Sequence, residues 1–148
     1  MLFRSETYLI VADNGSSNYA LTSTVYNTNY LSGVSVTVAS GYVAPADVTD
    51  DMLWKFTKDG SSYDIMNGTN YLNRRGGTSG GLYVGSEGTN AESNWKYSDP
   101  GHFLYTTGSF YYDMYLAGAS PGPYYFGQGV GVEGTIYLYK RVITPWAG

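Results

Sequence analysis

The chain has 148 residues, a length that fits one domain with a single core. It contains no cysteine, which excludes disulfides, thiolate metal sites and a cysteine nucleophile. The formal net charge is −4, the wrong sign for a surface that collects phosphates, so we expect no nucleic-acid partner. Only 14% of the residues are charged, and the 17 tyrosines and 20 glycines favour an all-β protein with a polar, mostly uncharged surface.

The first residues are unusual for a natural gene product. Leu2-Phe3-Arg4-Ser5 is what the tail of a common sequencing-adapter oligonucleotide encodes. We therefore expect residues 1–5 to be an artefact of cloning or sequence assembly, and the natural start, with any export signal, to lie upstream. No apolar run reaches the about 20 residues that span a bilayer, so we expect no membrane insertion.

Strand signals follow one another along the chain, and helical periodicity is nearly absent. The only helical candidate is a short turn over residues 45–48. Alternation of apolar and polar residues, ended by Gly, Asn or Asp, predicts strands over 8–11, 19–21, 34–38, 53–56, 63–66, 82–84, 95–97, 103–105 and 135–139. The predicted fold class is therefore all-β.

Two short motifs recur along the chain at separations of about 41–44 residues. One is an aromatic-Leu pair and the other an aromatic-x-aromatic pair, and they begin at Tyr30, Tyr71 and Tyr115, and at Trp54, Trp95 and Tyr137. This spacing predicts three pseudo-repeats of about 40 residues, over about 6–60, 61–101 and 102–142, with 143–148 as a linker. In the longer first unit, either Tyr19-Ala20-Leu21 or Tyr30-Leu31 matches Tyr71-Leu72, and we expect the extra residues to lengthen a hairpin.

Three units of about four strands fit a β-trefoil, a six-stranded barrel capped by three hairpins. One such unit cannot bury both of its faces, whereas three units share one core and close the barrel, which removes exposed edges. We expect Trp54, Trp95, Tyr137 and the Tyr-Leu pairs to lie in that core.

The layout of these repeats resembles the ricin-type β-trefoil lectins, whose repeats have a Tyr-Leu-like second strand and end in a Gln-x-Trp motif. That family binds sugar with an acidic residue after the second strand, an aromatic residue on the third strand and a polar residue just before the Gln. The middle unit matches best, with Asn73, Tyr83 and Glu92 at these places. The Gln is replaced in every unit, by Met52, Ser93 and Thr135.

Tyrosine pairs in the third unit offer a second kind of sugar contact. Because neighbours on a strand point to opposite faces, one of Tyr111/Tyr112 and one of Tyr124/Tyr125 is expected to face outward, where a flat ring suits a pyranose or a protein partner. Arg74, followed by Arg75, is expected either to clamp an acidic sugar or to be solvated on its strand. The predicted ligand-binding residues are Asn73, Arg74, Tyr83, Glu92, Tyr112, Tyr125 and Gln128.

No residue pattern predicts catalysis, a metal or a cofactor. His102 is the only histidine, and no Gly-x-Ser-x-Gly elbow accompanies it. The carboxylates Asp47, Asp50 and Asp51, and Glu87 with Glu92, are the candidates for a glycosidase pair, but Asp50-Asp51 is interpreted as part of a solvated turn. The first three also lack EF-hand spacing for calcium. The glycine-rich run 76–81 is interpreted as a hairpin loop, since no helix follows it to bind phosphate.

The sequence therefore predicts a non-enzymatic carbohydrate-binding module, with a protein-binding or structural module of an adhesin or pilus-like protein as the alternative. The residue pattern of its strands also resembles that of modules in surface-anchored proteins of Gram-positive gut bacteria. That second resemblance implies a monomeric domain of a larger chain, located at the cell surface or outside the cell.

Overall fold

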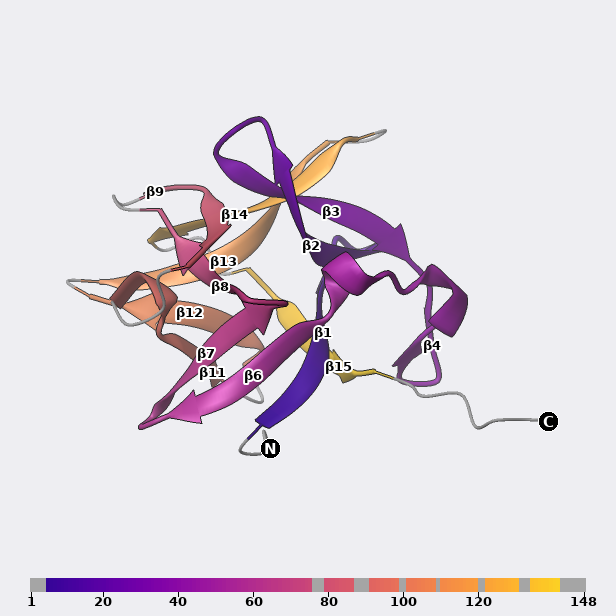
Figure 1. Cartoon of the computed structure of the whole chain (residues 1–148). Coiled ribbons are helices and arrows are strands. Elements are labelled where there is room, and N and C mark those ends of the chain that lie inside the picture. Colours follow the sequence, from indigo (N-terminus) through magenta and orange to yellow (C-terminus); the bar gives the residue numbers. More distant parts are fainter. Residues whose placement is uncertain are drawn as a thin grey trace.

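The computed structural model describes residues 5–75, 79–86, 91–98, 101–108, 110–119, 122–130 and 134–141 (Figure 1). The longer strands are β1 (Ser5–Asp13), β2 (Asn18–Tyr26), β3 (Tyr30–Val36), β6 (Trp54–Asp59), β7 (Ser62–Asn67), β8 (Asn70–Arg74), β10 (Leu82–Gly85), β11 (Trp95–Ser98), β12 (Phe103–Thr107), β13 (Tyr111–Gly118), β14 (Tyr124–Val130) and β15 (Ile136–Lys140). The two-residue strands are β4 (Val38–Ala39), β5 (Tyr42–Val43) and β9 (Ser79–Gly80), and the 3-10 helices are η1 (Pro45–Asp47), η2 (Asp50–Met52) and η3 (Ala91–Ser93). No helix within these ranges is long and apolar enough to cross a membrane.

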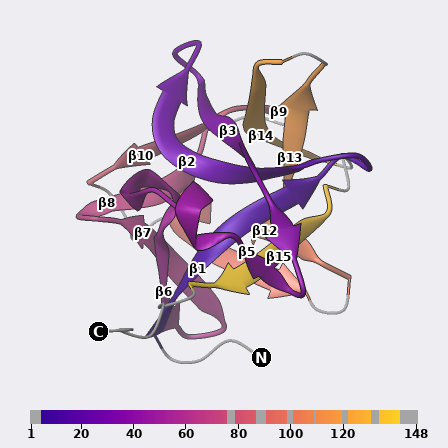
Figure 2. The same ribbon diagram turned by 90° about the vertical axis from the view of Figure 1, so that its right-hand side faces the viewer.

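Six strands form a barrel in the order β15–β1–β6–β7–β11–β12, each paired antiparallel with the next. The backbone N–H of Ile136 donates to the carbonyl of His102 over 2.8 Å, which joins the start of β15 to the start of β12. The hairpins β2–β3, β8–β10 and β13–β14 complete the three units. The hairpins β2–β3 and β13–β14 lie in the upper part of Figure 2. The predicted β-trefoil is confirmed.

Two tryptophans mark equivalent positions in the first two units. Trp54 and Trp95 each begin the last strand of their unit and are fully buried. Trp54 Nε1 donates to the carbonyl of Leu21 over 3.0 Å, and Trp95 Nε1 donates to that of Leu72 over 2.9 Å. Leu21 is therefore the counterpart of Leu72, so Tyr19-Ala20-Leu21 is the correct match for Tyr71-Leu72.

The third unit places a smaller residue where the other two have tryptophan. Ile136 begins β15 and is fully buried, whereas Tyr137 is half-buried and lies against the ring of His102, with 4.4 Å between the ring centroids. The expectation that Tyr137 lies in the core is wrong, because the aromatic motif is displaced there by one residue. Gly134, rather than Thr135, precedes the core residue by two positions, and a Cβ at Gly134 would come within 2.1 Å of the Met114 carbonyl.

The extra length of the first unit builds a second small core. Leu9 and Val11, on the outer face of β1, pack with Val43 and Met52 from the segment between β3 and β6. That segment contains the β4–β5 hairpin, η1 and η2. The predicted short turn at 45–48 is confirmed as η1, but the extra residues cover the barrel instead of lengthening a hairpin.

We expect Trp54→Phe and Trp95→Phe to lower the free energy of unfolding by similar amounts, about 2–3 kcal/mol each. Each change leaves a buried leucine carbonyl without its donor and removes ring volume from the core. Urea unfolding measures the cost, and Phe110→Leu, at a position that is 52% exposed, is the control, expected within about 0.5 kcal/mol of the parent. A cost in only one tryptophan variant would contradict their equivalence.

Candidate functional site

The structure brings part of the predicted site in the second unit together. Asn73 on β8 and Tyr83 on β10 are direct cross-strand partners. Asn73 is fully buried, however, and its Nδ2 donates to the Tyr71 carbonyl over 3.0 Å. The guanidinium of Arg75 lies 5.0 Å from the centroid of the Tyr83 ring and so covers one face of it. Glu92 lies half-buried in η3, which packs against β8.

Arg74 and Tyr112 form a contact inside the protein. Arg74 is only 5% exposed, its Nε donates to Thr106 Oγ1 over 2.6 Å, and its guanidinium stacks 3.7 Å from the centroid of the Tyr112 ring. The expectation of a solvated Arg74 is wrong, because Tyr112 and Thr106 of the third unit enclose it. The prediction of Tyr112 as an outward ligand contact is also wrong, since Tyr111 is the exposed member of that pair, at 68%.

Gln128 holds two hairpins together. It is fully buried on β14 opposite Gly80 of β9, and its Nε2 donates to the Arg75 carbonyl over 3.1 Å. The side chain of Arg75 in turn donates to the carbonyl of Asn29 in the turn after β2. Gly81 lies against the same turn, where a Cβ would come within 1.3 Å of the Asn29 carbonyl oxygen. Gln128 thus has a structural position, away from solvent.

Tyr125 belongs to a tyrosine cluster between hairpins. Its ring stacks on Tyr26 at 4.8 Å and lies 4.7 Å from Tyr30, measured between centroids. Tyr115 lies close to Tyr30 and Tyr125. Its pKa is raised mainly by burial and further by the hydroxyls of these two tyrosines. Each of these four rings is partly covered. Much of the surface of Tyr125 is therefore used in packing against other tyrosines.

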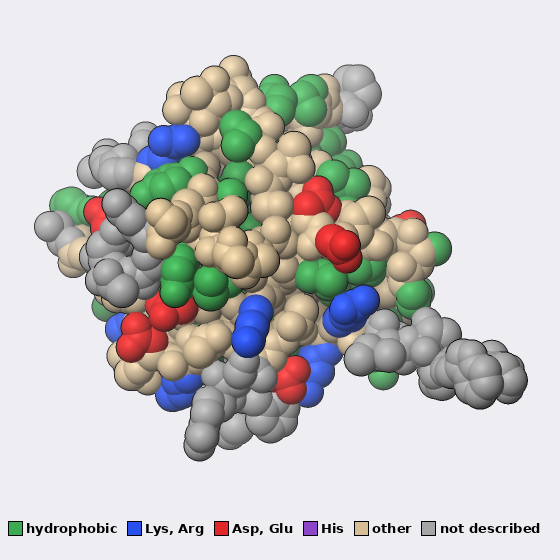
Figure 3. Space-filling view, viewed as in Figure 1, with side chains coloured by type: hydrophobic (Ala, Val, Ile, Leu, Met, Phe, Trp, Pro, Cys, Tyr) green, Lys and Arg blue, Asp and Glu red, His purple; other side chains and the backbone are tan. Residues whose placement is uncertain are grey.

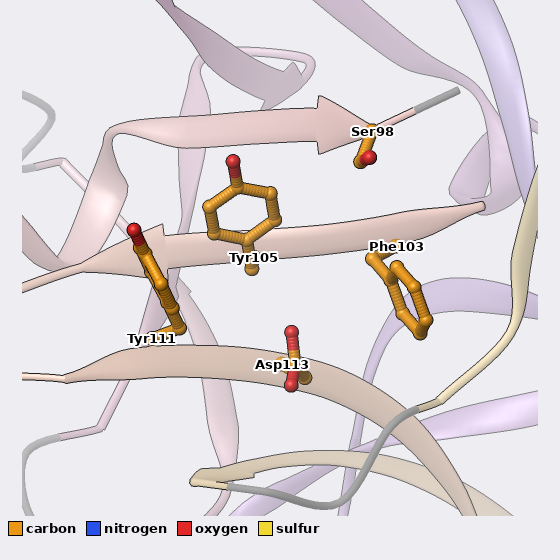
Figure 4. A pocket seen from close by; sticks show the side chains of 5 residues that line it. All are labelled: Ser98, Phe103, Tyr105, Tyr111 and Asp113. Atoms are coloured by element: carbon orange, nitrogen blue, oxygen red, sulfur yellow. The ribbon is translucent and has the colours of Figure 1, made fainter. Parts of the chain in front are cut away.

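An open hollow of about 330 Å³ lies on the outer face of β11, β12 and β13 (Figure 4). We call it the aromatic hollow, and its lining residues are Ser98, Phe103, Tyr105, Tyr111 and Asp113. The register of the strands sets its geometry, because Ser98 pairs with Phe103 and Tyr105 pairs with Asp113. The rings of Tyr105 and Tyr111 meet edge to face at 5.5 Å.

Alternation along two strands separates this hollow from the core. Leu104 and Thr106 on β12, and Tyr112 and Met114 on β13, are buried, so the residues between them face outward. In Figure 4 the Asp113 carboxylate lies between Tyr111 and Phe103 and below Tyr105. Three apolar rings around a carboxylate and the Ser98 hydroxyl can bind a small ligand that has both an apolar face and hydrogen-bond donors.

A second hollow, of about 310 Å³, lies where the turn after β1 meets β13. Its polar groups already stabilise that turn. Asp13 Oδ1 accepts from the Gly15 N–H over 2.7 Å, and Asn14 Oδ1 accepts from the backbone of Ser16 and Ser17. The side chains of Asp13 and Asn14 are thus engaged in local hydrogen bonds that hold this turn.

The loop carboxylates also serve local structure. Asp47 Oδ2 accepts from the Thr37 N–H over 2.7 Å, and Asp51 accepts from the hydroxyls of Thr24 and Thr49. The described ranges contain no group of three side chains able to hold a metal. On the face drawn in Figure 3, acidic and basic side chains are interspersed over the described surface. Glu87, residues 76–78 of the glycine-rich run and the predicted linker 143–148 lie outside the described residues.

The single histidine has a structural contact. The Tyr97 hydroxyl donates to the Ile136 carbonyl over 2.8 Å and lies 3.0 Å from His102 Nδ1. Because the hydroxyl has one proton and uses it on the carbonyl, Nδ1 must carry the proton in the second bond. His102 therefore fixes the junction of β11, β12 and β15.

Comparisons with known proteins agree on the fold. A designed threefold-symmetric protein, ThreeFoil, superposes with a TM-score of 0.62 at 11% identity, covering 91% of this chain and 99% of that one. The β-trefoil lectin of a Vibrio vulnificus hemolysin/cytolysin, solved with N-acetyl-D-lactosamine bound, superposes with a TM-score of 0.62 at 11% identity, covering 95% and 98%. The chain is thus a β-trefoil protein. No protein-family model matches its sequence, and no curated protein does so either.

We expect Arg74→Lys to lower the free energy of unfolding by about 1–3 kcal/mol. A lysine cannot stack a planar guanidinium on Tyr112 while also donating to Thr106. Thermal and urea unfolding measure the cost, and Arg141→Lys, at an exposed position, is the matched control. Equal stability of the two variants would show that the stacked contact contributes little.

We expect stability to fall as the pH rises above about 10, and to fall less steeply in Tyr115→Phe. Burial, with Tyr30 and Tyr125 nearby, raises the pKa of Tyr115 above the ordinary 10.0. The unfolded chain therefore loses this proton first, so the contribution is complete below pH 10.0 and is lost as the pH rises through the folded-state pKa. Urea unfolding between about pH 9 and 11 measures this, with Tyr42→Phe, at an exposed position, as the control. An unchanged slope in Tyr115→Phe would refute it.

Proposed function

We propose that this protein is a non-enzymatic carbohydrate-binding module of a bacterial surface or secreted protein, and that the aromatic hollow is its sugar site. The observation that carries the proposal is the outward grouping of Phe103, Tyr105 and Tyr111 around the carboxylate of Asp113. Its volume of about 330 Å³ falls at the lower end of the range of ligand pockets. The Vibrio vulnificus lectin, which carries a bound sugar on the same fold, supports the proposal as an analogy.

The hollow supplies two kinds of contact that a pyranose needs. The parts of the Tyr105 and Tyr111 ring faces that their edge-to-face contact leaves open offer apolar surface to the C–H face of the pyranose. The carboxylate of Asp113 accepts hydrogen bonds from sugar hydroxyls, and the hydroxyl of Ser98 both donates and accepts. A charged acceptor makes stronger hydrogen bonds than a neutral one, so Asp113 is proposed to orient the sugar.

A protein partner is the second candidate, and one observation favours it. Phe110 and Tyr111 stand side by side in the chain at the start of β13 and are 52% and 68% exposed. Aromatic side chains of this kind are enriched in contact patches between proteins. A module of an adhesin or pilus-like protein would use them to bind a partner chain instead of a sugar.

We expect a glycan array to detect binding by the parent protein, and Tyr111→Ala to weaken it about tenfold or more. Loss of one ring contact of about 1.4 kcal/mol corresponds to that factor. Tyr111 is largely exposed, so the variant retains the core, and Tyr42→Ala, 58% exposed on β5, is the matched control.

The array also separates the alternatives. Loss of binding in Tyr83→Ala but not in Tyr111→Ala would move the site to the second unit, as the resemblance to ricin-type lectins implies. A blank array with folded protein would contradict sugar binding and favour the protein-binding module.

A further inference from the structure

We propose that the aromatic hollow selects glycans that carry a protonated amine, such as sugars with a free 2-amino group. This inference rests on the proposed function and adds the class of ligand. Its basis is the position of the Asp113 carboxylate among three aromatic rings, a combination that suits a cation better than a neutral hydroxyl.

Aromatic rings attract cations through their faces. The ring quadrupole is negative over the face, and a cation within about 6 Å of the centroid is stabilised, more so where water is partly excluded. Tyr105 and Tyr111 meet edge to face with their planes at 80°, so the edge of one ring covers part of the face of the other, and an amine is attracted by the ring faces that remain open to the hollow. Phe103 closes the opposite side of the hollow in Figure 4.

The carboxylate supplies the second attraction. Asp113 is the direct cross-strand partner of Tyr105, and its carboxylate lies next to that ring on the outer face of the sheet (Figure 4). An ionised carboxylate accepts about four hydrogen bonds, which leaves capacity for an ammonium group in addition to contacts within the protein. An ammonium group adds a direct Coulomb attraction to its hydrogen bond with the carboxylate, whereas a neutral hydroxyl has the hydrogen bond alone, so an amine gains more here than a hydroxyl does.

The charged groups nearby are compatible with a cationic ligand. Lys96 on β11 is the other cross-strand partner of Tyr105, and two strand spacings of about 4.8 Å place its Cα roughly 10 Å from the Cα of Asp113. Within the described ranges, the cations that lie over rings are Lys58, Arg74 and Arg75, and their rings are not those of the hollow. The aromatic faces of the hollow are thus not occupied by a cation of the described part of the chain.

The test compares two oligosaccharides that differ only in acetylation. Titration calorimetry at about pH 6 measures the affinity for glucosamine tetramer and for its fully N-acetylated form. We expect the parent protein to bind the free amine about tenfold more tightly, and this preference to fall as salt rises from about 50 to 500 mM. Asp113→Asn keeps the shape of the side chain and removes its charge, so we expect the preference to disappear. Asp59→Asn, at an exposed carboxylate at the end of β6, is the matched control, and we expect it to keep the preference.

Two failures are distinguishable. Equal affinity for both tetramers in the parent protein, or a preference that survives in Asp113→Asn, would overturn the amine inference and leave sugar binding in place. Absence of binding to both tetramers, together with a blank glycan array, would overturn the proposed function and this inference with it. Thermal unfolding of Asp113→Asn confirms that the variant is folded. Tyr111→Ala is expected to lower the affinity for both tetramers.

Discussion

The constraint on which the whole molecule depends is that one core must be filled from three units at once. Every barrel strand sends alternate residues into that core, and the remaining residues of the same strand must face outward. On the barrel strand β12 and on β13, the hairpin strand that pairs with it, the inward set is Leu104, Thr106, Tyr112 and Met114, and the outward set is Phe103, Tyr105, Tyr111 and Asp113. Which positions line the aromatic hollow is therefore determined by which positions face the core.

The same constraint explains which parts of the fold were predictable. The spacing of the repeats and the alternation within strands predicted an all-β trefoil, because both are local patterns. Trp54 and Trp95 stood out as core residues, and their equivalent hydrogen bonds support that assignment. In the third unit the core residue is Ile136, and the neighbouring Tyr137 imitated the motif. A displacement of one residue exchanges the two faces of a strand, so aligning the motif on Tyr137 instead of Ile136 led to the wrong prediction that Tyr137 lies in the core.

The individual site residues were harder to predict, because their positions depend on contacts between units. Arginine is rarely buried, and Arg74 is buried only because Thr106 and Tyr112 of another unit hold its guanidinium. Gln128 is similarly held by the backbone of Arg75. Nothing within each local segment indicates these partners. The choice between Tyr111 and Tyr112 also required the register of β13 against β12, which alternation alone leaves open.

The outer faces of equivalent strands explain why the proposed site belongs to one unit. β1 and β12 each begin a unit, and both send alternate residues into the core. Outside the barrel, Leu9 and Val11 of β1 are covered by the segment that contains β5 and η2. The outward residues of β12, Phe103 and Tyr105, instead line an open hollow. The insertion that stabilises the first unit thus covers the surface equivalent to the one that the third unit leaves open, so the outer face of β1 cannot form the hollow proposed for β12.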